Sequence, residues 1–325
     1  MPNPVFVLAD GPFVDPALVE PHGAAAGVEL RRALLETPAA VAAATAGADG
    51  VLVVTNPLPR ELIEAFAPSV RIIGRAGVGL DAIDLDAARE RGIAVFHTPD
   101  YCIDEVATHT LALALGLNRK LVQGDAVVRA DWTDWRALAP VAPLSEQTVG
   151  IVGVGRIGQA VAARFAPFVR ELLAFDPWSD VELPGVRRVG EIGELLAGSD
   201  VVTLHLPLTA DTDRLIDAEA LARMKPTALL VNVSRGGLID EQALAQALRE
   251  GRLAGAGLDV LASEPPPADH PLLNAPNVLL SPHFAWYSTG SEQRVWSSTL
   301  DGMLAVLGER APAAGRVAVA AGAPA

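Results

Sequence analysis

The sequence predicts an α/β protein built from parallel sheets with crossover helices, and three observations lead to this class. Short apolar runs of strand length alternate with helical patterns along the chain, which is typical of strands joined by helices in parallel sheets. The length of 325 residues favours two domains. Half of the residues are hydrophobic, so the protein can bury cores that need no disulfide to hold them.

In the first third of the chain, we expect strands from four apolar runs and a helix between the second and third. A glycine-rich turn follows the third run. A long helical pattern then covers residues 103–122 and is the best candidate for a bridge between domains. Residues 125–147 read as irregular structure. The four expected strands lie at residues 5–8, 51–54, 71–73 and 93–96, and the helix lies at residues 59–66.

A second series of apolar runs predicts the strands of the second domain. Helices fit between them, as at 156–168 and at 240–250, where Gly251 is a stop signal. After Ser281 the chain reads as helical to about Gly308 and then frays into an Ala/Gly/Pro tail. The expected strands are residues 149–152, 171–175, 201–204, 228–233, 256–260 and 278–280.

We expect the last helix to return to the first domain, which makes that domain discontinuous in sequence. The expected domains are residues 1–101 together with 288–325, and residues 102–287.

The charge and cysteine content exclude several classes of protein. A net charge of −14 argues against nucleic acid or an anionic membrane as partner. Cys102 is the only cysteine, so no intramolecular disulfide is possible, and a reducing compartment is indicated. We find no signal peptide and no apolar run long enough to span a bilayer, and therefore expect a cytoplasmic protein. No metal ligand set is expected.

A dinucleotide-binding fingerprint, G-x-G-x-x-G, stands at residues 153–158. It follows an expected strand and opens an expected helix, as the motif requires. Gly153 permits a tight turn, Gly155 lets a pyrophosphate approach the backbone, and Gly158 lets the helix pack against the strand. The N-terminus of that helix faces the phosphates.

Asp176 ends the strand that follows the fingerprint. A carboxylate there can accept hydrogen bonds from ribose hydroxyls and would repel a 2′-phosphate. Residues 177–180 offer no arginine to hold such a phosphate. We therefore expect NAD rather than NADP. The alternative is an ordinary glycine turn followed by a surface aspartate.

Arg235, Glu264 and His283 each come shortly after an apolar run. Strand C-termini in an open parallel sheet line the ligand crevice. A guanidinium can hold a carboxylate bidentately and polarise the neighbouring carbonyl, and an imidazole can donate a proton to a forming alkoxide. A glutamate bonded to the other ring nitrogen would fix the tautomer. Beside a nicotinamide, these groups suit reduction of a 2-oxo acid.

Each of these residues also has an ordinary structural interpretation. Arg235 could be a surface arginine in an Arg-Gly-Gly turn, and a lone histidine is more often structural than catalytic. Glu264 could be a solvated loop acid beside three prolines. Asp259, which ends the preceding strand, could serve the nicotinamide end of the cofactor or cap a turn.

At these motifs the chain resembles the D-2-hydroxyacid dehydrogenase family, from about Arg71 to about Leu307. The resemblance implies that Arg235, Glu264 and His283 are the catalytic triad. It also implies two doubly wound domains, a Rossmann cofactor domain inserted into a flavodoxin-like substrate domain, with the active site in the cleft between them. In this family, backbone N–H groups, here those of Ala76, Gly77 and Val78, bind the substrate carboxylate, and Arg75 resembles a residue that reaches a distal anion in phosphoglycerate dehydrogenases. The implied cofactor contacts are Val78, Thr108, Gly153, Gly155, Arg156, Ile157, Gly158, Asp176, His205, Pro207, Val233, Ser234 and Asp259.

Residues 283–288 resemble the C-terminal-binding-protein branch of the family, whose members are NAD-binding corepressors. There, a tryptophan at the position of Trp286 faces the substrate pocket, while Phe284 replaces the small residue usual in that branch. Tyr101 is expected to border the pocket. Trp132 and Trp135 fall where the family places an arm that packs across a homodimer, and ordinary core filling is the alternative.

The sequence as a whole indicates an NAD-dependent oxidoreductase acting on a small 2-oxo or 2-hydroxy acid. Two alternatives stay open. One is a dehydrogenase-like scaffold that senses NADH and recruits partners, and the other is a phosphite-type oxidoreductase, because phosphite-oxidising relatives use a similar triad.

Overall fold

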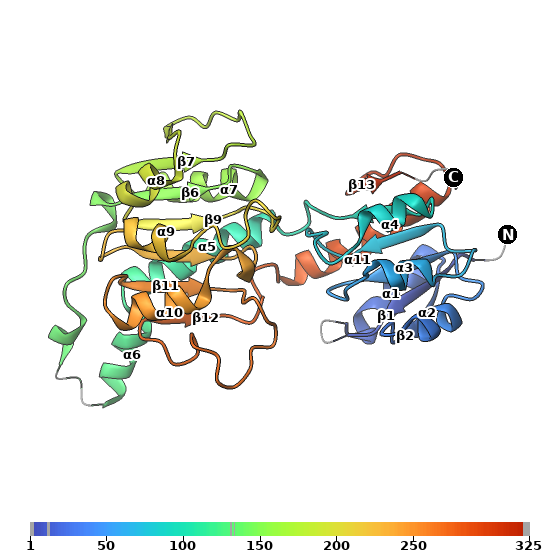
Figure 1. The fold of residues 1–325 in the computed structure, drawn as a ribbon, viewed down its shortest axis with the longest axis horizontal. Helices are drawn as coiled ribbons and strands as arrows, with labels where there is room; N and C mark the ends of the chain where they lie inside the picture. The colour runs from blue at the N-terminus through green and yellow to red at the C-terminus, as the bar shows by residue number, and fades with distance from the viewer. Residues whose placement is uncertain (1–2, 12–13, 131, 133, 321–325) are drawn as a thin grey trace. The chain divides into compact units, whose positions relative to one another are not determined.

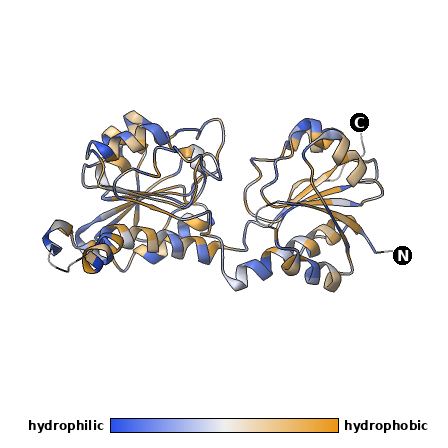
Figure 2. Ribbon diagram, turned by 90° about the horizontal axis from the view of Figure 1, so that it is seen from below, coloured by the Kyte–Doolittle hydropathy of each residue, from blue (hydrophilic) through white to orange (hydrophobic). Residues whose placement is uncertain are grey.

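The computed structural model describes residues 3–11, 14–130, 132 and 134–320. The chain forms two compact units (Figure 1). The first extends to Cys102 and resumes at Ser288, and the second comprises Ile103–Tyr287. In each unit the strands are largely hydrophobic and lie between layers of helices (Figure 2).

The described part of the first unit contains one sheet with the strand order β13-β5-β4-β3-β1-β2. All neighbours are parallel except β13, which runs antiparallel to β5. Without β13, the order is the flavodoxin-like 2-1-3-4-5. The strands are β1 (Val5–Ala9), β2 (Glu29–Ala33), β3 (Gly50–Val53), β4 (Ile72–Arg75), β5 (Ala94–His97) and β13 (Arg316–Val319).

Helices cover both faces of this sheet because successive strand residues point to opposite sides. In β1, Phe6 packs into a core with Trp296 of α11, whereas Val7 packs into a core with Ile63 of α3. The helices of this unit are α1 (Pro16–Ala26), α2 (Pro38–Ala44), α3 (Arg60–Glu64), α4 (Leu85–Glu90) and α11 (Thr289–Leu307).

In the second unit, the sheet has the order β12-β11-β10-β9-β6-β7-β8, and all of its described pairs are parallel. This is the doubly wound order of a Rossmann fold, with the reversal between β6 and β9. The expected fold class is thus confirmed. The strands are β6 (Thr148–Val152), β7 (Glu171–Phe175), β8 (Val186–Arg188), β9 (Val201–Leu204), β10 (Leu229–Asn232), β11 (Gly255–Leu258) and β12 (Val278–Leu280).

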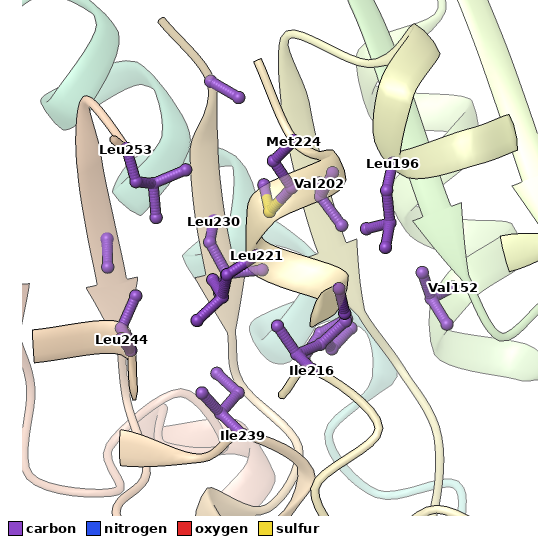
Figure 3. Close-up of a cluster of buried hydrophobic side chains, with 14 of the residues drawn as sticks. Val152, Leu196, Val202, Ile216, Leu221, Met224, Leu230, Ile239, Leu244 and Leu253 are labelled. Atoms are coloured by element: carbon purple, nitrogen blue, oxygen red, sulfur yellow. The ribbon is translucent and has the colours of Figure 1, made fainter. Parts of the chain in front are cut away.

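One face of the second sheet is buried under three helices. Leu196, Leu221 and Leu244, one from each helix, meet strand residues such as Val202 and Leu230 in a single core (Figure 3). On β11, α5 comes so close that a Cβ at Gly257 would lie 3.1 Å from side-chain atoms of α5. The helices are α5 (Ile103–Asn118), α6 (Leu121–Ala130), α7 (Arg156–Phe165), α8 (Ile192–Gly198), α9 (Ala218–Arg223) and α10 (Glu241–Arg249).

Several expected elements were wrong in extent. The predicted helix 103–122 ends at Asn118, because Lys120 has a φ of +50° and breaks it before α6. The helix expected from Ser281 begins only at Thr289, where Ser288 caps it in a reciprocal pair of bonds with Ser291. Residues 125–147, expected to be irregular, include the end of α6 and two short 3-10 helices.

Three strands were missed. β2 and β8 contain mostly exposed and intermediate residues, and the tail expected to fray forms β13. All three are edge strands of their sheets, and an edge strand needs no continuous apolar run.

No helix in the described ranges combines the length and the apolar character needed to cross a membrane.

Candidate active site

The glycine fingerprint lies at the reversal of strand order in the second unit, directly after β6. Gly153 has a φ of +94°, and a Cβ there would lie 2.6 Å from the carbonyl oxygen of His205. A Cβ at Gly158 would lie 2.0 Å from the carbonyl oxygen of Gly153. The helix therefore packs on the glycine turn itself, rather than only on the strand as expected. Around Gly155 the space is open.

Helix α7 begins at this turn, with Gly155 at its N-cap and Arg156 and Ile157 as its first two residues. Its first backbone bond runs from Gln159 N to Gly155 O. The first-turn amides of a helix and the positive end of its dipole suit an anion. Together with the open space at Gly155, they fit the pyrophosphate of an NAD-type cofactor.

Asp176, one residue after β7, is tied to the same turn. Its Oδ2 accepts from Val154 N at 2.8 Å, and its Oδ1 accepts from Trp178 N at 3.0 Å. Each oxygen keeps further acceptor capacity for a ribose hydroxyl. Arg188 on β8 was not identified from the sequence; its guanidinium donates to the Asp176 carbonyl at 2.7 Å and to the Val181 carbonyl. An arginine is therefore present beside Asp176 after all.

The expected cofactor residues after β9 and β10 lie in neighbouring loops. Both ring nitrogens of His205 are buried, and neither has a partner among the described residues. Burial lowers its pKa to about 3, so the ring is neutral. Pro207 follows it, and Ser234, next to Val233, donates to Leu204 O at 2.8 Å.

Thr108 lies apart from these loops, on α5. Its hydroxyl accepts from Arg164 of α7 at 3.3 Å.

Asp259, one residue after β11, organises the loop that carries His283. Its side chain is 1% exposed. The carboxylate accepts from the backbone amides of Phe284 and Ala285 at 2.9 and 2.8 Å and from the hydroxyl of Ser281 at 2.5 Å. Its own carbonyl accepts from His283 N at 2.7 Å. Asp259 thus caps a turn, which was one of its two expected roles; the turn itself could not be named from the sequence, because it lies more than twenty positions away.

His283 contacts Glu264 and adopts an unusual backbone conformation. Its Nδ1 lies 2.7 Å from Glu264 Oε2, and the two side chains are 28% and 30% exposed. Its φ is +52°, in the left-handed region that residues other than glycine rarely occupy. Such strain persists where surrounding contacts over-determine it, and is commonest at functional sites.

Glu264 is held in its ionised form. Burial by itself would raise the pKa of this carboxyl, but the hydrogen bond and charge of His283, the amide of Leu261 and the charge of Arg235 together hold the pKa below its usual value. All three expected triad members belong to the second unit, where Glu264 and His283 are in direct contact.

Arg235 follows β10 in a turn that Asn232 shapes. The Asn232 amide donates to Arg235 O at 2.8 Å, and its Oδ1 accepts from Ser234 N. The guanidinium of Arg235 donates to Ser234 O at 2.7 Å. Asn232, fully buried at the strand end, is a supporting residue that the sequence argument missed.

Aromatic rings follow His283 directly. Phe284 stacks on Tyr287 with ring centroids 4.9 Å apart, and Trp286 meets the edge of Tyr287 at 5.5 Å. Tyr287 therefore joins the two expected pocket residues into one cluster and was not singled out from the sequence.

The glycine-rich turn after β4 lies in the first unit, with Arg75 at the strand end. The amides of Ala76 and Gly77, which are expected to bind a carboxylate, donate to Val53 O and Arg75 O respectively in this structure. The amides of Val78 and the next residue, Gly79, have no partner among the described residues. The Arg75 guanidinium folds back onto Gly79 O at 3.1 Å and onto Ala76 O.

Tyr101 also belongs to the first unit. Its carbonyl accepts from Arg294 of α11 at 2.9 Å.

The described residues contain no group of three or more His, Cys, Asp or Glu side chains placed to hold a metal ion.

Comparison with known proteins gives consistent matches. A family model described as "D-isomer specific 2-hydroxyacid dehydrogenase, NAD binding domain" matches residues 111–285. The D-3-phosphoglycerate dehydrogenase of Mycobacterium leprae is 38% identical over 83% of this chain and 51% of that protein. The glyoxylate reductase of Thermofilum pendens is 40% identical over 80% of this chain and 78% of that protein. The chain thus spans about half the length of the phosphoglycerate dehydrogenase.

Solved structures agree. The TT0316 protein from Thermus thermophilus superposes with a TM-score of 0.84 and 35% identity, covering 96% of this chain and 99% of that one. A D-2-hydroxyisocaproate dehydrogenase superposes with a TM-score of 0.81 and 26% identity over the same shares.

Proposed function

Because the chain belongs to the D-isomer specific 2-hydroxyacid dehydrogenase family, we propose that it transfers a hydride between NAD(H) and a small 2-oxo or 2-hydroxy acid. The observation that carries this proposal is the 2.7 Å contact between His283 Nδ1 and Glu264 Oε2, next to the charge of Arg235. It lies in the unit that also holds the dinucleotide fingerprint. The single cysteine and the family's chemistry suit a cytoplasmic location.

His283 is the proton-transfer group in this proposal. With Nδ1–H donated to Glu264, the other nitrogen, Nε2, carries the transferable proton. In reduction it protonates the carbonyl oxygen as that oxygen gains negative charge, and in oxidation it takes the proton back. The cofactor, when bound, supplies or accepts the hydride, so a 2-oxo acid becomes a 2-hydroxy acid as NADH becomes NAD.

Arg235 binds the acid in this proposal. Its planar fork can hold a carboxylate with two parallel bonds and polarise the carbonyl beside it. We assign a second set of carboxylate donors to the glycine-rich turn of Ala76, Gly77 and Val78, extended to the amide of Gly79, and a contact with any distal anion to Arg75. Tyr101, Phe284 and Trp286 are proposed to shape the pocket for the substrate side chain.

For the cofactor, we propose that Asp176 binds the adenosine ribose and that Asp259 serves the nicotinamide end. Thr108, His205, Pro207, Val233 and Ser234 supply further contacts. We propose NAD as the preferred cofactor, because the Arg188 guanidinium is already bonded to two carbonyl oxygens and the Asp176 carboxylate would repel a 2′-phosphate.

A panel assay tests the function. The purified chain is mixed with NADH and, one at a time, glyoxylate, hydroxypyruvate, pyruvate and bulkier 2-oxo acids, and loss of NADH is followed by absorbance. The reverse direction uses NAD with the 2-hydroxy acids and with phosphite. Reduction of at least one 2-oxo acid that disappears in Arg235→Ala supports the proposal. Tight NADH binding without turnover of any acid would favour the scaffold, and turnover of phosphite alone would favour the phosphite alternative.

We also propose that the chain forms a homodimer through α6 and the segment after it. Trp132 and Trp135 are 72% and 58% exposed, so the alternative of core filling is wrong for them. They line a hollow of about 390 Å³ together with Leu121 and Val128 of α6, which are also exposed, and exposed large apolar side chains gathered in one place are typical of an interaction surface. Light scattering tests this: a monomeric mass, or a dimer that Trp135→Ala leaves unchanged, would contradict it.

A further inference from the structure

A largely buried acid–base pair outside the triad joins α10 to the loop that carries Glu264. Glu241 is the first residue of α10, and its Oε2 lies 3.0 Å from Nε2 of His270. The two side chains are 14% and 8% exposed. The Nδ1 of His270 faces the amide of Leu272 at 3.4 Å. In this arrangement Nδ1 accepts, and Nε2–H donates to the carboxylate.

The other oxygen of Glu241 holds the peptide group between Leu261 and Ala262. Its Oε1 accepts from Ala262 N at 2.8 Å. The same peptide lies against Gly236, where a Cβ would come within 2.0 Å of the Leu261 carbonyl carbon and 2.1 Å of Ala262 N. Because Gly236 directly follows the triad arginine, this peptide is the joint between the arginine turn and the loop that carries Glu264.

A short path leads from this joint to the catalytic imidazole. The amide of Leu261 donates to Glu264 Oε1 at 3.1 Å, and Glu264 Oε2 contacts His283 Nδ1 at 2.7 Å. Residues 262–265 are exposed and have little core packing to fix them. The Leu261 amide belongs to the preceding 260–261 peptide, and Leu261 joins that peptide to the 261–262 peptide. Holding the 261–262 peptide therefore fixes the Glu264 carboxylate through the backbone of Leu261.

We propose that Glu241 and His270 are positioning residues that hold the 261–262 peptide and thereby aim the Glu264 carboxylate at His283. This inference rests on the proposed function, because it assigns the pair a role in that reaction. Neither residue contacts the imidazole of His283 through a bond of its own, so both act through Glu264. His270 keeps the Glu241 carboxylate turned toward the 261–262 peptide. Glu241 thereby fixes Leu261, whose own amide, in the preceding peptide, donates to Glu264.

The first test is a double-mutant cycle measured by steady-state kinetics. Glu241→Ala should lower kcat for 2-oxo acid reduction roughly tenfold, because loosening a positioned group by a fraction of an ångström has effects of this size. The KM for NADH should stay within about twofold, since neither Glu241 nor His270 is among the proposed cofactor residues. In a Glu264→Gln background, the same substitution should cost less than about twofold, because residues acting as one unit are not additive.

Matched variants separate positioning from general damage to α10. Glu250→Ala removes a glutamate at the end of the same helix, where it bonds Gln246 and Arg252, and should leave kcat unchanged. His270→Ala should behave like Glu241→Ala. His270→Gln keeps a donor near the place of Nε2 and should restore most of the activity. A full tenfold loss of kcat in His270→Gln would show that His270 does not position Glu241 in the way proposed.

A second readout needs no substrate and so separates this inference from the proposed function. The chain has six histidines, and NMR of isotope-labelled histidine, with His283 assigned by His283→Asn, follows its titration directly. In Glu241→Ala the titration midpoint should fall, since a less firmly aimed carboxylate favours the imidazolium less. Glu250→Ala should leave it in place. If the wild-type chain reduces no 2-oxo acid, the proposed function fails. This titration still tests whether Glu241 positions the Glu264 carboxylate at His283.

Two outcomes would overturn the inference. One is a Glu241→Ala loss of the same factor with and without Glu264→Gln. The other is an unchanged His283 titration in Glu241→Ala together with a lower melting temperature, which would make the pair a structural support of α10 alone.

Discussion

Replacing Glu264 by glutamine should move the pH dependence of both reaction directions to lower pH. Glu264 has a depressed pKa in the folded protein, so it is ionised around neutral pH, and a negative charge in contact with an imidazole favours the protonated ring. Glutamine keeps the shape and one acceptor but loses this charge. Reduction needs the protonated ring and falls as pH rises, whereas oxidation needs the neutral ring and falls as pH drops.

The structure sets the size of the shift. The contact of 2.7 Å is a charge-assisted hydrogen bond, but both side chains are more than a quarter exposed. Solvent screening therefore points to the low end of the usual range for such bonds, about 1.5 kcal/mol. That free energy corresponds to about one pH unit. The alkaline limb of reduction and the acid limb of oxidation should both move down by roughly this amount.

Initial rates of NADH-dependent reduction and NAD-dependent oxidation, measured across the pH range at saturating cofactor, give both limbs. A companion variant, His283→Asn, removes the proton donor while asparagine tolerates the left-handed backbone at this position. It should lower kcat by roughly a hundredfold or more. Adding Glu264→Gln to it should change little, because the two residues act as a unit.

Unchanged pH profiles in Glu264→Gln would refute this reasoning. Losses that simply multiply in the double variant would do the same, because they would show that the glutamate acts independently of the histidine.

Three further outcomes follow from the site. Wild type should prefer NAD over NADP by at least about tenfold in kcat/KM, or 1.4 kcal/mol, and Asp176→Ala should relax that preference; equal use of both cofactors by the wild type would contradict the role of Asp176. Arg235→Lys keeps the charge but loses the planar fork, so both KM for the acid and kcat should worsen, and a wild-type kcat/KM would remove Arg235 from the site. Trp286→Ala should weaken bulky 2-oxo acids far more than glyoxylate, and an equal loss across the substrate panel would mean that Trp286 only packs against Tyr287.

Local patterns predicted the parts of the fold that follow from burial. The central strands of both sheets are continuous apolar runs because helices cover both faces, as at Val51 and Leu230. The edge strands β2 and β8 have no such constraint and were missed. The loop at 281–288 was wrongly predicted as helix. Its residues are held by hydrogen bonds to Asp259 and Glu264, and such bonds leave no hydrophobic pattern that distinguishes the loop from a helix.

The candidate site divides in the same way. Arg235, Glu264 and His283 could be named from the sequence because each is a reactive side chain just beyond a predicted strand, and parallel strands end at one edge. The Gly153 turn was likewise predicted, because glycine is the residue that accepts the positive φ it requires.

Tertiary structure alone decided how these groups are held. Arg188 at Asp176, the amides bound by Asp259 and the Glu241–His270 pair all join segments that only the folded sheet brings together. The same holds for the engaged amides of Ala76 and Gly77. Sequence therefore determines which chemical groups reach the strand ends, through local burial and backbone preference. Their partners depend on distances between separate loops, which no local pattern encodes.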